Sequence, residues 1–335
     1  MMHCIFQSKH NYGADAKLIL NSKGEVVLVS FTEKILATLL AKLSNFIPEA
    51  GIWMNTLRPE WNDANNALVG YGASMVTLNY MRRFVRFAKE LYQQSQVENF
   101  TVSKEMEDFF MGIFNAFIAD EKMLDKGFDN KARRSITDKL GKAGNDYRNS
   151  IYKGFSDKQA TINKVDLNNF FTLTLAYIDQ SIAVNKRADN MYHAYNLVSF
   201  SSDSIEINYL YEMLEGQVAA LTSGKLTPKE TLDLLNSLRN SSLYRPDQNS
   251  YILYPNKKRP LFLEKNNIDK EDVNRIKLLK DLIAAKNTNI ITKDKNGNYH
   301  FNADFNNASF LNKALNKLKS SGDFEVSASD QQAIL

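Results

Sequence analysis

Hydrophobic residues recur at three- and four-residue spacing along most of this chain, and this period is typical of helices buried on one face. The segment from Thr32 to about Phe46 is the clearest case. Its apolar stripe consists of Ile35, Leu36, Leu39, Leu40 and Leu43. Further helices are predicted at residues 67 or 74 to 94, 103–124, 130–153, 167–184, 208–222, 227–239, 269–285 and 307–320. The chain is therefore expected to be mainly α.

Small polar residues mark the expected starts of several helices, because their side chains accept hydrogen bonds from backbone N–H groups of the first turn. We expect Thr32, Ser103 and Asp166 to cap the helices that follow them. Thr227 and Glu230 have the spacing of a capping box. These residues indicate where the predicted helices begin.

The predicted helix 130–153 differs from the others, because it is rich in charge and sparse in apolar residues. We expect it to be exposed. Gly141 and Gly144 should weaken it, since glycine in a helix interior is unfavourable relative to alanine.

Short apolar runs on either side of turn residues predict two small β-hairpins. One covers residues 18–30 around Asn21–Gly24, and the other joins 290–292 to 299–301 through Lys295–Asn298. Residues 191–207 are interpreted as extended segments and loop.

Composition excludes several classes of protein. The 335 residues carry 42 basic and 38 acidic side chains, so the net charge of +4 calls for no nucleic-acid partner. The single cysteine, Cys4, excludes an intramolecular disulfide, and the four histidines lack metal-ligand spacing. No apolar run is long enough to span a membrane. A soluble, cytoplasmic protein without metal or cofactor is expected.

Candidate chemistry is concentrated between residues 58 and 66. This stretch contains Arg58, Glu60, Trp61, Asn62, Asp63, Asn65 and Asn66. Guanidinium, amide and carboxylate groups pair with sugar hydroxyls, and an indole stacks on the apolar face of a sugar ring. A protonated carboxyl among them could act as general acid toward a glycosidic oxygen. The segment therefore predicts a site for an oligosaccharide substrate.

The order of residues here resembles the Asp-Trp-Asn-Asp-Gly-Met-Asn loop of the cellobiose phosphorylase-like glycoside phosphorylases. The resemblance covers about residues 50 to 90 and implies that Asp63 is the general acid. Trp61 and Asn62 would line the donor-sugar subsite, with Glu60 where the family usually has Asp. Ala64 and Asn65 replace the Gly-Met pair of the family.

The same resemblance implies the architecture. Catalytic domains of this family are (α/α)6 toroids of helical hairpins, but only one convincing helix precedes the motif in this chain. Residues 1–335 are therefore expected to form a single helical region, an incomplete toroid with long loops. Its first part, 1–100, bears the motif, and 101–335 is helical. Alone, the chain should be inactive and self-associate through exposed apolar faces.

The reaction that the family implies is inverting phosphorolysis of a β-linked di- or oligosaccharide, with inorganic phosphate as candidate co-substrate. Burial near Trp61 and a neighbouring carboxylate would have to raise the pKa of Asp63. Hydrolysis is the alternative reaction. It needs a second carboxylate to activate water, and Glu60, Asp15 and Glu49 are the candidates for that base.

A second candidate segment is the irregular, tyrosine- and proline-rich stretch 243–262. Arg245, Asp247, Gln248 and Tyr251 would be its sugar-contacting residues. Two readings without catalysis remain open. The chain could be a carbohydrate-binding protein that uses Trp61 and Arg58, or a helical scaffold that binds partners through the face of 130–153.

Overall fold

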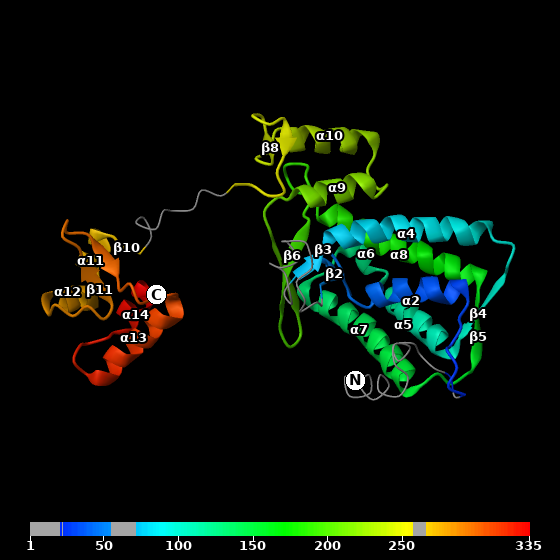
Figure 1. Cartoon of the computed structure of the whole chain (residues 1–335), viewed down its shortest axis with the longest axis horizontal. Helices are drawn as coiled ribbons and strands as arrows, with labels where there is room; N and C mark the ends of the chain where they lie inside the picture. The colour runs from blue at the N-terminus through cyan, green and yellow to red at the C-terminus, as the bar shows by residue number, and fades with distance from the viewer. Residues whose placement is uncertain (1–20, 22, 55–71, 257–265) are drawn as a thin grey trace. The chain divides into compact units, whose positions relative to one another are not determined.

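The computed structural model describes residues 21, 23–54, 72–256 and 266–335. Contacts divide the chain into two compact units, an amino-terminal unit Met1–Asn256 and a carboxyl-terminal unit Lys257–Leu335 (Figure 1). The sequence patterns did not predict this boundary. Assignment of 1–335 to one incomplete catalytic domain stays a prediction.

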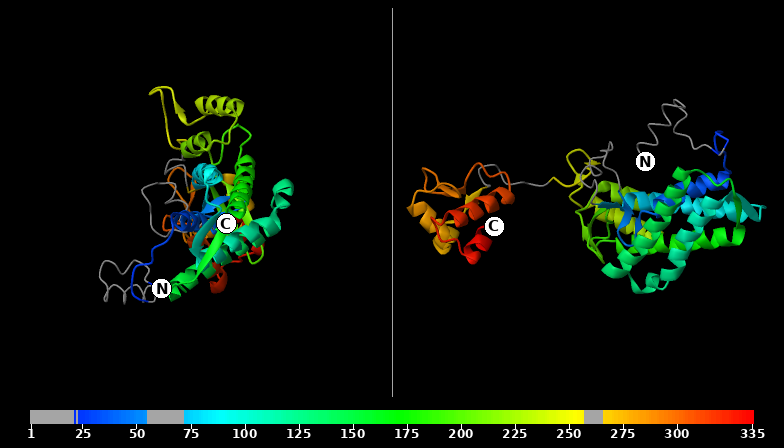
Figure 2. Two further views of the ribbon diagram at one scale, coloured as in Figure 1. Left: turned by 90° about the vertical axis from the view of Figure 1, so that its right-hand side faces the viewer. Right: turned by 90° about the horizontal axis from the view of Figure 1, so that it is seen from below.

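Five long helices form the main helical group among the described residues of the amino-terminal unit. They are α2 (Phe31–Leu43), α4 (Met75–Gln94), α5 (Lys104–Asp120), α7 (Asn130–Lys153) and α8 (Lys164–Val184). Helix α4 packs along α8, and α5 packs along α7. Figure 2 shows these helices as one packed group in two further views. Their apolar stripes meet in a core rich in phenylalanine and leucine, as the three- and four-residue period predicted.

Three shorter helices are also found among the described residues of this unit: α6 (Met123–Lys126), α9 (Leu214–Thr222) and α10 (Pro228–Arg239). The predicted capping box is confirmed at α10, where the Thr227 hydroxyl accepts the Glu230 N–H and the Glu230 carboxylate accepts the Thr227 N–H. The predicted start of a helix at 208 was wrong, because the chain there is still extended.

Five antiparallel strands form a sheet beside these helices, in the order β1-β2-β3-β6-β7. They are β1 (Phe46–Ile47), β2 (Gly51–Trp53), β3 (Gly72–Ser74), β6 (Tyr195–Phe200) and β7 (Ile205–Tyr209). Two separate two-stranded sheets are formed by β4 (Asn99–Ser103) with β5 (Gln159–Asn163), and by β8 (Tyr244–Arg245) with β9 (Ser250–Tyr251). The described β-structure thus exceeds the two predicted hairpins, and Phe46 belongs to a strand rather than to a helix end.

Two predicted helix caps were wrong by two or three residues. Ser30, not Thr32, caps α2, and Asn163, not Asp166, caps α8. The Thr32 side chain is buried, and its hydroxyl accepts a 3.0 Å hydrogen bond from Tyr92. Asp166 lies in the first turn of α8, where its backbone N–H donates to the Asn163 side chain. In both cases a second capping-type residue nearby takes the position.

The carboxyl-terminal unit has its own small core and sheet. Its elements are β10 (Asn267–Ile268), α11 (Lys270–Arg275), α12 (Lys277–Ala284), β11 (Ile291–Lys293), β12 (Tyr299–Phe301), α13 (Ala308–Ser321) and α14 (Ala328–Ile334). The predicted hairpin 290–301 is confirmed as β11 and β12, with β10 on the other side of β12. The predicted helix 269–285 is two helices, because Ile276 is extended.

The turn predicted in the first hairpin is present, since the Asn21 N–H donates to Glu25 and the Gly24 N–H donates to Asn21. The strand before it lies outside the described residues. With 54% helix and twelve described helices, the mainly α class is confirmed. A toroid is not established by the described helices and stays a prediction. None of these helices is both long and apolar enough to cross a membrane.

The two glycines of α7 occupy different environments. A Cβ at Gly144 would lie 2.6 Å from the Ser44 Cβ, whereas a Cβ at Gly141 would meet nothing within 4 Å. Gly144 therefore allows α7 to approach the end of α2 closely. The prediction that both glycines merely weaken the helix was incomplete, because Gly144 has a packing role.

We expect Gly144→Ala and Gly141→Ala to have opposite effects. The new methyl group at 144 should destabilise the protein by about 1 to 3 kcal/mol through overpacking. At 141 it should stabilise by about 0.5 to 1 kcal/mol through helix propensity. Urea unfolding of the two variants measures both effects. Equal changes in stability would contradict the close contact with Ser44.

Candidate functional site

The residues of the first predicted site lie outside the described part of the chain. This applies to Arg58, Glu60, Trp61, Asn62, Asp63, Asn65 and Asn66. The residues that flank the segment are described. Met54 follows β2 and donates its backbone N–H to the carbonyl of Gly72, the first residue of β3, over 2.9 Å. Met54 and Gly72, the described residues on either side of 55–71, thus lie next to each other at the adjoining ends of β2 and β3.

Glu49, one of the three candidate bases, is buried in the turn between β1 and β2. Its carboxylate accepts hydrogen bonds from the Phe128 N–H at 3.0 Å, the Gln180 side chain at 2.8 Å and the Arg133 guanidinium at 2.7 Å. A carboxylate that is 9% exposed and bound to a guanidinium is too weak a base to activate a water molecule. The hypothesis that Glu49 serves as a hydrolytic base is therefore wrong.

Arg133 is the centre of this buried cluster. Its five N–H donors bond the Glu49 carboxylate, the Asn130 side chain and three backbone carbonyls, those of Pro48, Phe128 and Ile205. Every donor of the guanidinium is thus satisfied, as burial of a charge requires. The cluster fastens the β1–β2 turn and β7 to helix α7.

The backbone of Glu49 has φ of +65°, which glutamate seldom adopts. The Ala50 N–H donates to the Ile47 carbonyl, so Pro48 and Glu49 occupy the central positions of a tight turn. Asn185 donates to the Glu49 carbonyl over 2.6 Å, and Ser181 accepts the Glu49 N–H at 3.0 Å. These bonds from α8 hold the strained turn that precedes β2.

The second candidate segment is partly a small exposed hairpin. Arg245 and Asp247 form an ion pair with a 2.6 Å contact, and hydrogen bonding to Arg245 lowers the pKa of Asp247. The Gln248 N–H donates to the Arg245 carbonyl, which closes the turn. The Tyr251 ring packs 5.3 Å from that of Tyr244. The four predicted residues are therefore neighbours, and the Arg245 and Asp247 charges are already paired with each other.

A cavity of about 390 Å³ lies in the amino-terminal unit beside the end of β2. Its walls are largely apolar: Met54 follows β2, Val76 and Tyr80 come from α4, and Leu214 and Val218 come from α9. Leu253, two residues after Tyr251, also lines it. Of these residues, Met54 comes four residues before Arg58, and Leu253 lies within the second predicted segment, 243–262.

The polar groups of this cavity include Tyr195 on β6 and Glu215 on α9, and the Tyr195 hydroxyl donates to the Glu215 carboxylate. Sequence reasoning missed both residues. We refer to the space as the Tyr195–Glu215 cavity. The only available signal was the Glu-Gly-Gln triplet at 215–217, because glycine inside a helix often marks close packing.

The triplet places Glu215 against Tyr195 in two ways. A Cβ at Gly216 would lie 2.9 to 3.0 Å from atoms of Ala194, so glycine allows α9 to contact the start of β6. The buried Gln217 side chain accepts the Tyr192 N–H and donates to the Tyr192 carbonyl, each at 2.8 Å. A backbone hydrogen bond also connects Leu253 to the start of α9, because the Leu253 carbonyl accepts the Leu214 N–H at 2.8 Å.

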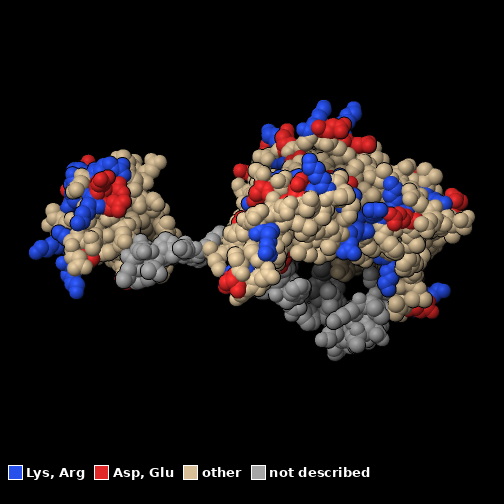
Figure 3. Space-filling view, turned by 90° about the horizontal axis from the view of Figure 1, so that it is seen from above, with Lys and Arg blue, Asp and Glu red and all other residues tan. Residues whose placement is uncertain are grey.

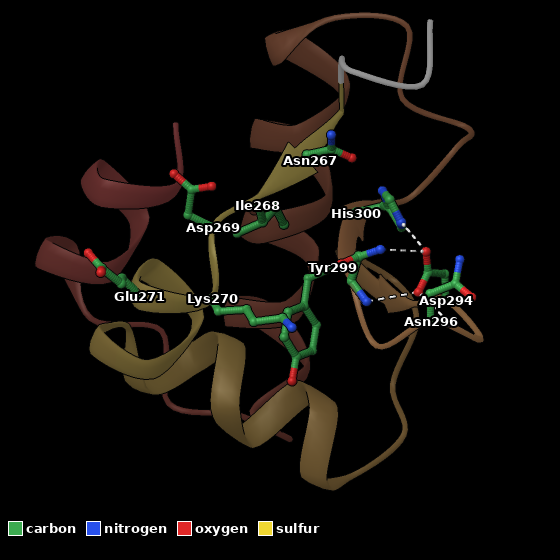
Figure 4. A pocket seen from close by; sticks show the side chains of 10 residues that line it. Asn267, Ile268, Asp269, Lys270, Glu271, Asp294, Asn296, Tyr299 and His300 are labelled. Carbon is green, nitrogen blue, oxygen red and sulfur yellow. Dashed lines mark hydrogen bonds and ion pairs between the residues drawn. The ribbon is translucent and has the colours of Figure 1, made fainter.

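The carboxyl-terminal unit contains a wider cavity of about 1050 Å³ beside the β11–β12 hairpin (Figure 4). Its polar lining includes Asn267, Asp269, Asp294, Asn296, Asn298 and His300. In Figure 4 the His300 side chain points toward Asp294, and its Nε2 lies 3.3 Å from the carboxylate. Such a set can exchange hydrogen bonds with a polar ligand.

Asp294 organises the turn of this hairpin. The backbone N–H of Asn298, at 2.8 Å, is the main cause that lowers the pKa of Asp294 to about 2, and His300 and the Asn296 N–H add to it. Because the folded pKa lies below the ordinary value, the carboxylate stabilises the turn above about pH 4. That stabilisation is lost as the pH falls toward 2.

We expect Asp294→Asn to lower the melting temperature of the carboxyl-terminal unit at pH 7. It should also reduce the loss of stability between about pH 4 and 2, because no carboxylate is left to protonate at that position. Melting curves from pH 2 to 7 test this. Asp304→Asn, at an exposed position of the same unit, serves as control and should leave the pH dependence unchanged.

The described residues contain no group of three or more potential metal-ligating side chains. On the face shown in Figure 3, basic and acidic side chains are interspersed over the amino-terminal unit. Candidates for ligand binding among its described residues include the exposed Arg245–Asp247 hairpin and the Tyr195–Glu215 cavity, which is lined by Leu253 of the same stretch.

Comparison with protein families gives one match. Residues 259–335, nearly the whole carboxyl-terminal unit, match the family model described as GH149 phosphorylase insertion domain 2. No curated protein matches the chain. The match supports a relation to a glycoside phosphorylase family. It does not include residues 50–90, so it does not extend to the narrower resemblance to cellobiose phosphorylase-like enzymes.

Proposed function

We propose that this chain belongs to the machinery of an inverting glycoside phosphorylase that acts on a β-linked di- or oligosaccharide. The observation that carries the proposal is the match of 259–335 to a phosphorylase insertion domain. The sugar-complementary residues between 58 and 66 support it independently, because they lie in a different unit of the chain.

In the proposed mechanism, Asp63 is protonated and gives its proton to the glycosidic oxygen. An oxygen of inorganic phosphate attacks the anomeric carbon from the opposite side as the bond to the leaving sugar breaks. The products are an α-sugar 1-phosphate and the shortened saccharide. Arg58, Glu60, Trp61, Asn62, Asn65 and Asn66 would bind the sugar on the donor side.

Hydrolysis would require a base for the attacking water. Of the three candidates, Glu49 is excluded by its buried pair with Arg133, and Glu60 and Asp15 lie outside the described residues. Phosphorolysis needs no such base, because phosphate is itself the nucleophile. The burial of Glu49 removes one of the three candidate bases for hydrolysis and so supports phosphorolysis.

The test is a turnover assay on the natural polypeptide that carries this sequence, with β-linked glucose disaccharides as substrates. The expected result is formation of sugar 1-phosphate that depends on added phosphate. Release of two free sugars without phosphate would identify a hydrolase. Absence of turnover on β-linked di- and oligosaccharides, in a folded protein, would contradict both reactions.

A further inference from the structure

We infer that helix α4 carries a docking surface for a second copy of this chain, which binds it antiparallel about a two-fold axis. The surface is a row of four apolar side chains, Tyr80, Phe84, Phe87 and Leu91, which we call the α4 stripe. All four belong to one described helix of the amino-terminal unit. The surface concerns assembly of the protein and is independent of the proposed reaction.

The α4 stripe follows the helix at spacings of four, three and four residues. This spacing keeps side chains on one side of a helix, and it is the pattern by which two helices pack against each other in a coiled coil. The same helix buries another face, which includes Leu78, Val85 and Ala88, in the core. Helix α4 therefore has one apolar side in the core and a further apolar side toward solvent.

Three members of the α4 stripe are well exposed. Phe87 is 58% exposed, Tyr80 46% and Leu91 40%, whereas Phe84 is partly buried against the core. A fully buried aromatic side chain removes about 150 to 250 Å² from water, so Phe87 and Tyr80 each leave on the order of 100 Å² uncovered. Single exposed apolar side chains are ordinary, but a continuous row of them indicates an interaction surface.

The charges along one edge of the α4 stripe indicate what covers it. Arg83 and Glu90 directly precede the stripe residues Phe84 and Leu91, so they lie along the same edge, one near each end. Both side chains are exposed. Arg83 has no partner among the described residues, and Glu90 pairs with Arg86 in a contact that is itself exposed. Opposite charges thus stand at the two ends of an apolar row.

Antiparallel pairing of two copies makes this pattern self-complementary. The end members Tyr80 and Leu91 would lie opposite each other, and the two phenylalanines between them would do the same. The same two-fold rotation would bring Arg83 of each copy beside Glu90 of the other, so the pair forms twice. A parallel pair would not bring these two charges together. The charge pattern therefore favours a second copy of the chain, in antiparallel orientation, as the occupant.

The test is analytical ultracentrifugation of the 335-residue chain. We expect a reversible monomer–dimer equilibrium with a dissociation constant in the micromolar range, because an interface centred on one helix is smaller than a standard interface. Phe87→Asp should raise this constant by about 100-fold or more, since it buries a charge in the apolar row. Ile118→Asp is the control. Ile118 is 49% exposed on α5, outside the α4 stripe, so this variant should associate as the parent chain does.

Exchange of charges tests the antiparallel arrangement. Arg83→Glu alone should weaken association by about tenfold at low ionic strength, because it places two carboxylates side by side at both pairs. Glu90→Arg alone should do the same with two guanidinium groups. The double variant Arg83→Glu/Glu90→Arg should dimerise within about threefold of the parent, because opposite charges are again paired. These exposed positions also supply the test if Phe87→Asp does not fold.

A parent chain that stays monomeric up to roughly 200 μM would overturn the dimer. A dimer that Phe87→Asp leaves intact would overturn the α4 stripe as its interface, because another face would then join the copies. Association of the double variant as weak as that of the single variants would overturn the antiparallel pairing. Turnover is not measured in any of these experiments, so failure of the proposed reaction would leave the dimer standing.

Discussion

Replacement of Asp63 by Asn is expected to lower turnover of an unactivated β-linked disaccharide by about two to four orders of magnitude. The amide keeps the size of the side chain but has no acidic proton, so the leaving sugar would have to depart as an alkoxide. Steady-state kinetics of the natural polypeptide, with phosphate in excess, measure the effect. Binding of the disaccharide should change much less than turnover.

A substrate with an activated leaving group distinguishes proton donation from a structural role. An aryl glycoside with an acidic phenol needs little protonation, so Asp63→Asn should reduce its turnover far less. Asp108→Asn is a suitable comparison, because Asp108 is an exposed residue of α5 that is paired with Lys104 and lies in neither sugar-contacting segment. Turnover of the disaccharide within a few-fold of the parent would assign the general acid to another residue.

Arg133→Leu should be the most destabilising of the substitutions considered. It leaves the Glu49 carboxylate buried without its cation and removes the donors of three backbone carbonyls. Breaking a buried pair by removing one partner costs about 3 to 5 kcal/mol. We expect a loss of this size in the free energy of unfolding, measured with urea, or failure of the chain to fold.

The next residue offers a matched control. Arg134 has the same side chain and pairs with Asp138 one turn along α7, but the two side chains are 27% and 59% exposed, and Arg134 bonds one backbone carbonyl, that of Ser201, rather than three. Exposed pairs contribute about 0 to 1 kcal/mol, so Arg134→Leu should have a small effect. Similar losses in the two variants would show that the buried cluster around Glu49 does not stabilise the sheet.

The helices were largely predictable because a helix is a local structure. Its hydrogen bonds join residues four apart, and its buried stripe repeats every three to four residues, so α5, α7 and α13 match the predicted segments closely. Caps were less predictable. Two residues within one turn can each take the N-cap position of a helix. At α2, Thr32 is bonded to Tyr92, and Ser30 is the N-cap instead.

The five-stranded sheet was mostly missed, because its strands are short and pair over long distances in sequence. Strand β3, for example, lies between β2 and β6, and Ala73 pairs with Asn196. Strands of two or three residues carry no period that sequence reasoning can detect. The predicted role of Glu49 was wrong for a related reason. Its ion-pair partner Arg133 is distant in the chain, so the sequence around Glu49 does not indicate the pair.

The sequence by itself determined the mainly α class, most helix boundaries, the β11–β12 hairpin and the hypothesis of a sugar site at 58–66 and 245–251. Each of these depends on residues that are neighbours along the chain. Only the tertiary structure decided that Glu49 is paired and buried, that Gly144 admits a close contact, and that Met54, Tyr195, Glu215 and Leu253 line one cavity. Burial and proximity arise from packing between distant segments, and the pattern of a single segment does not contain them.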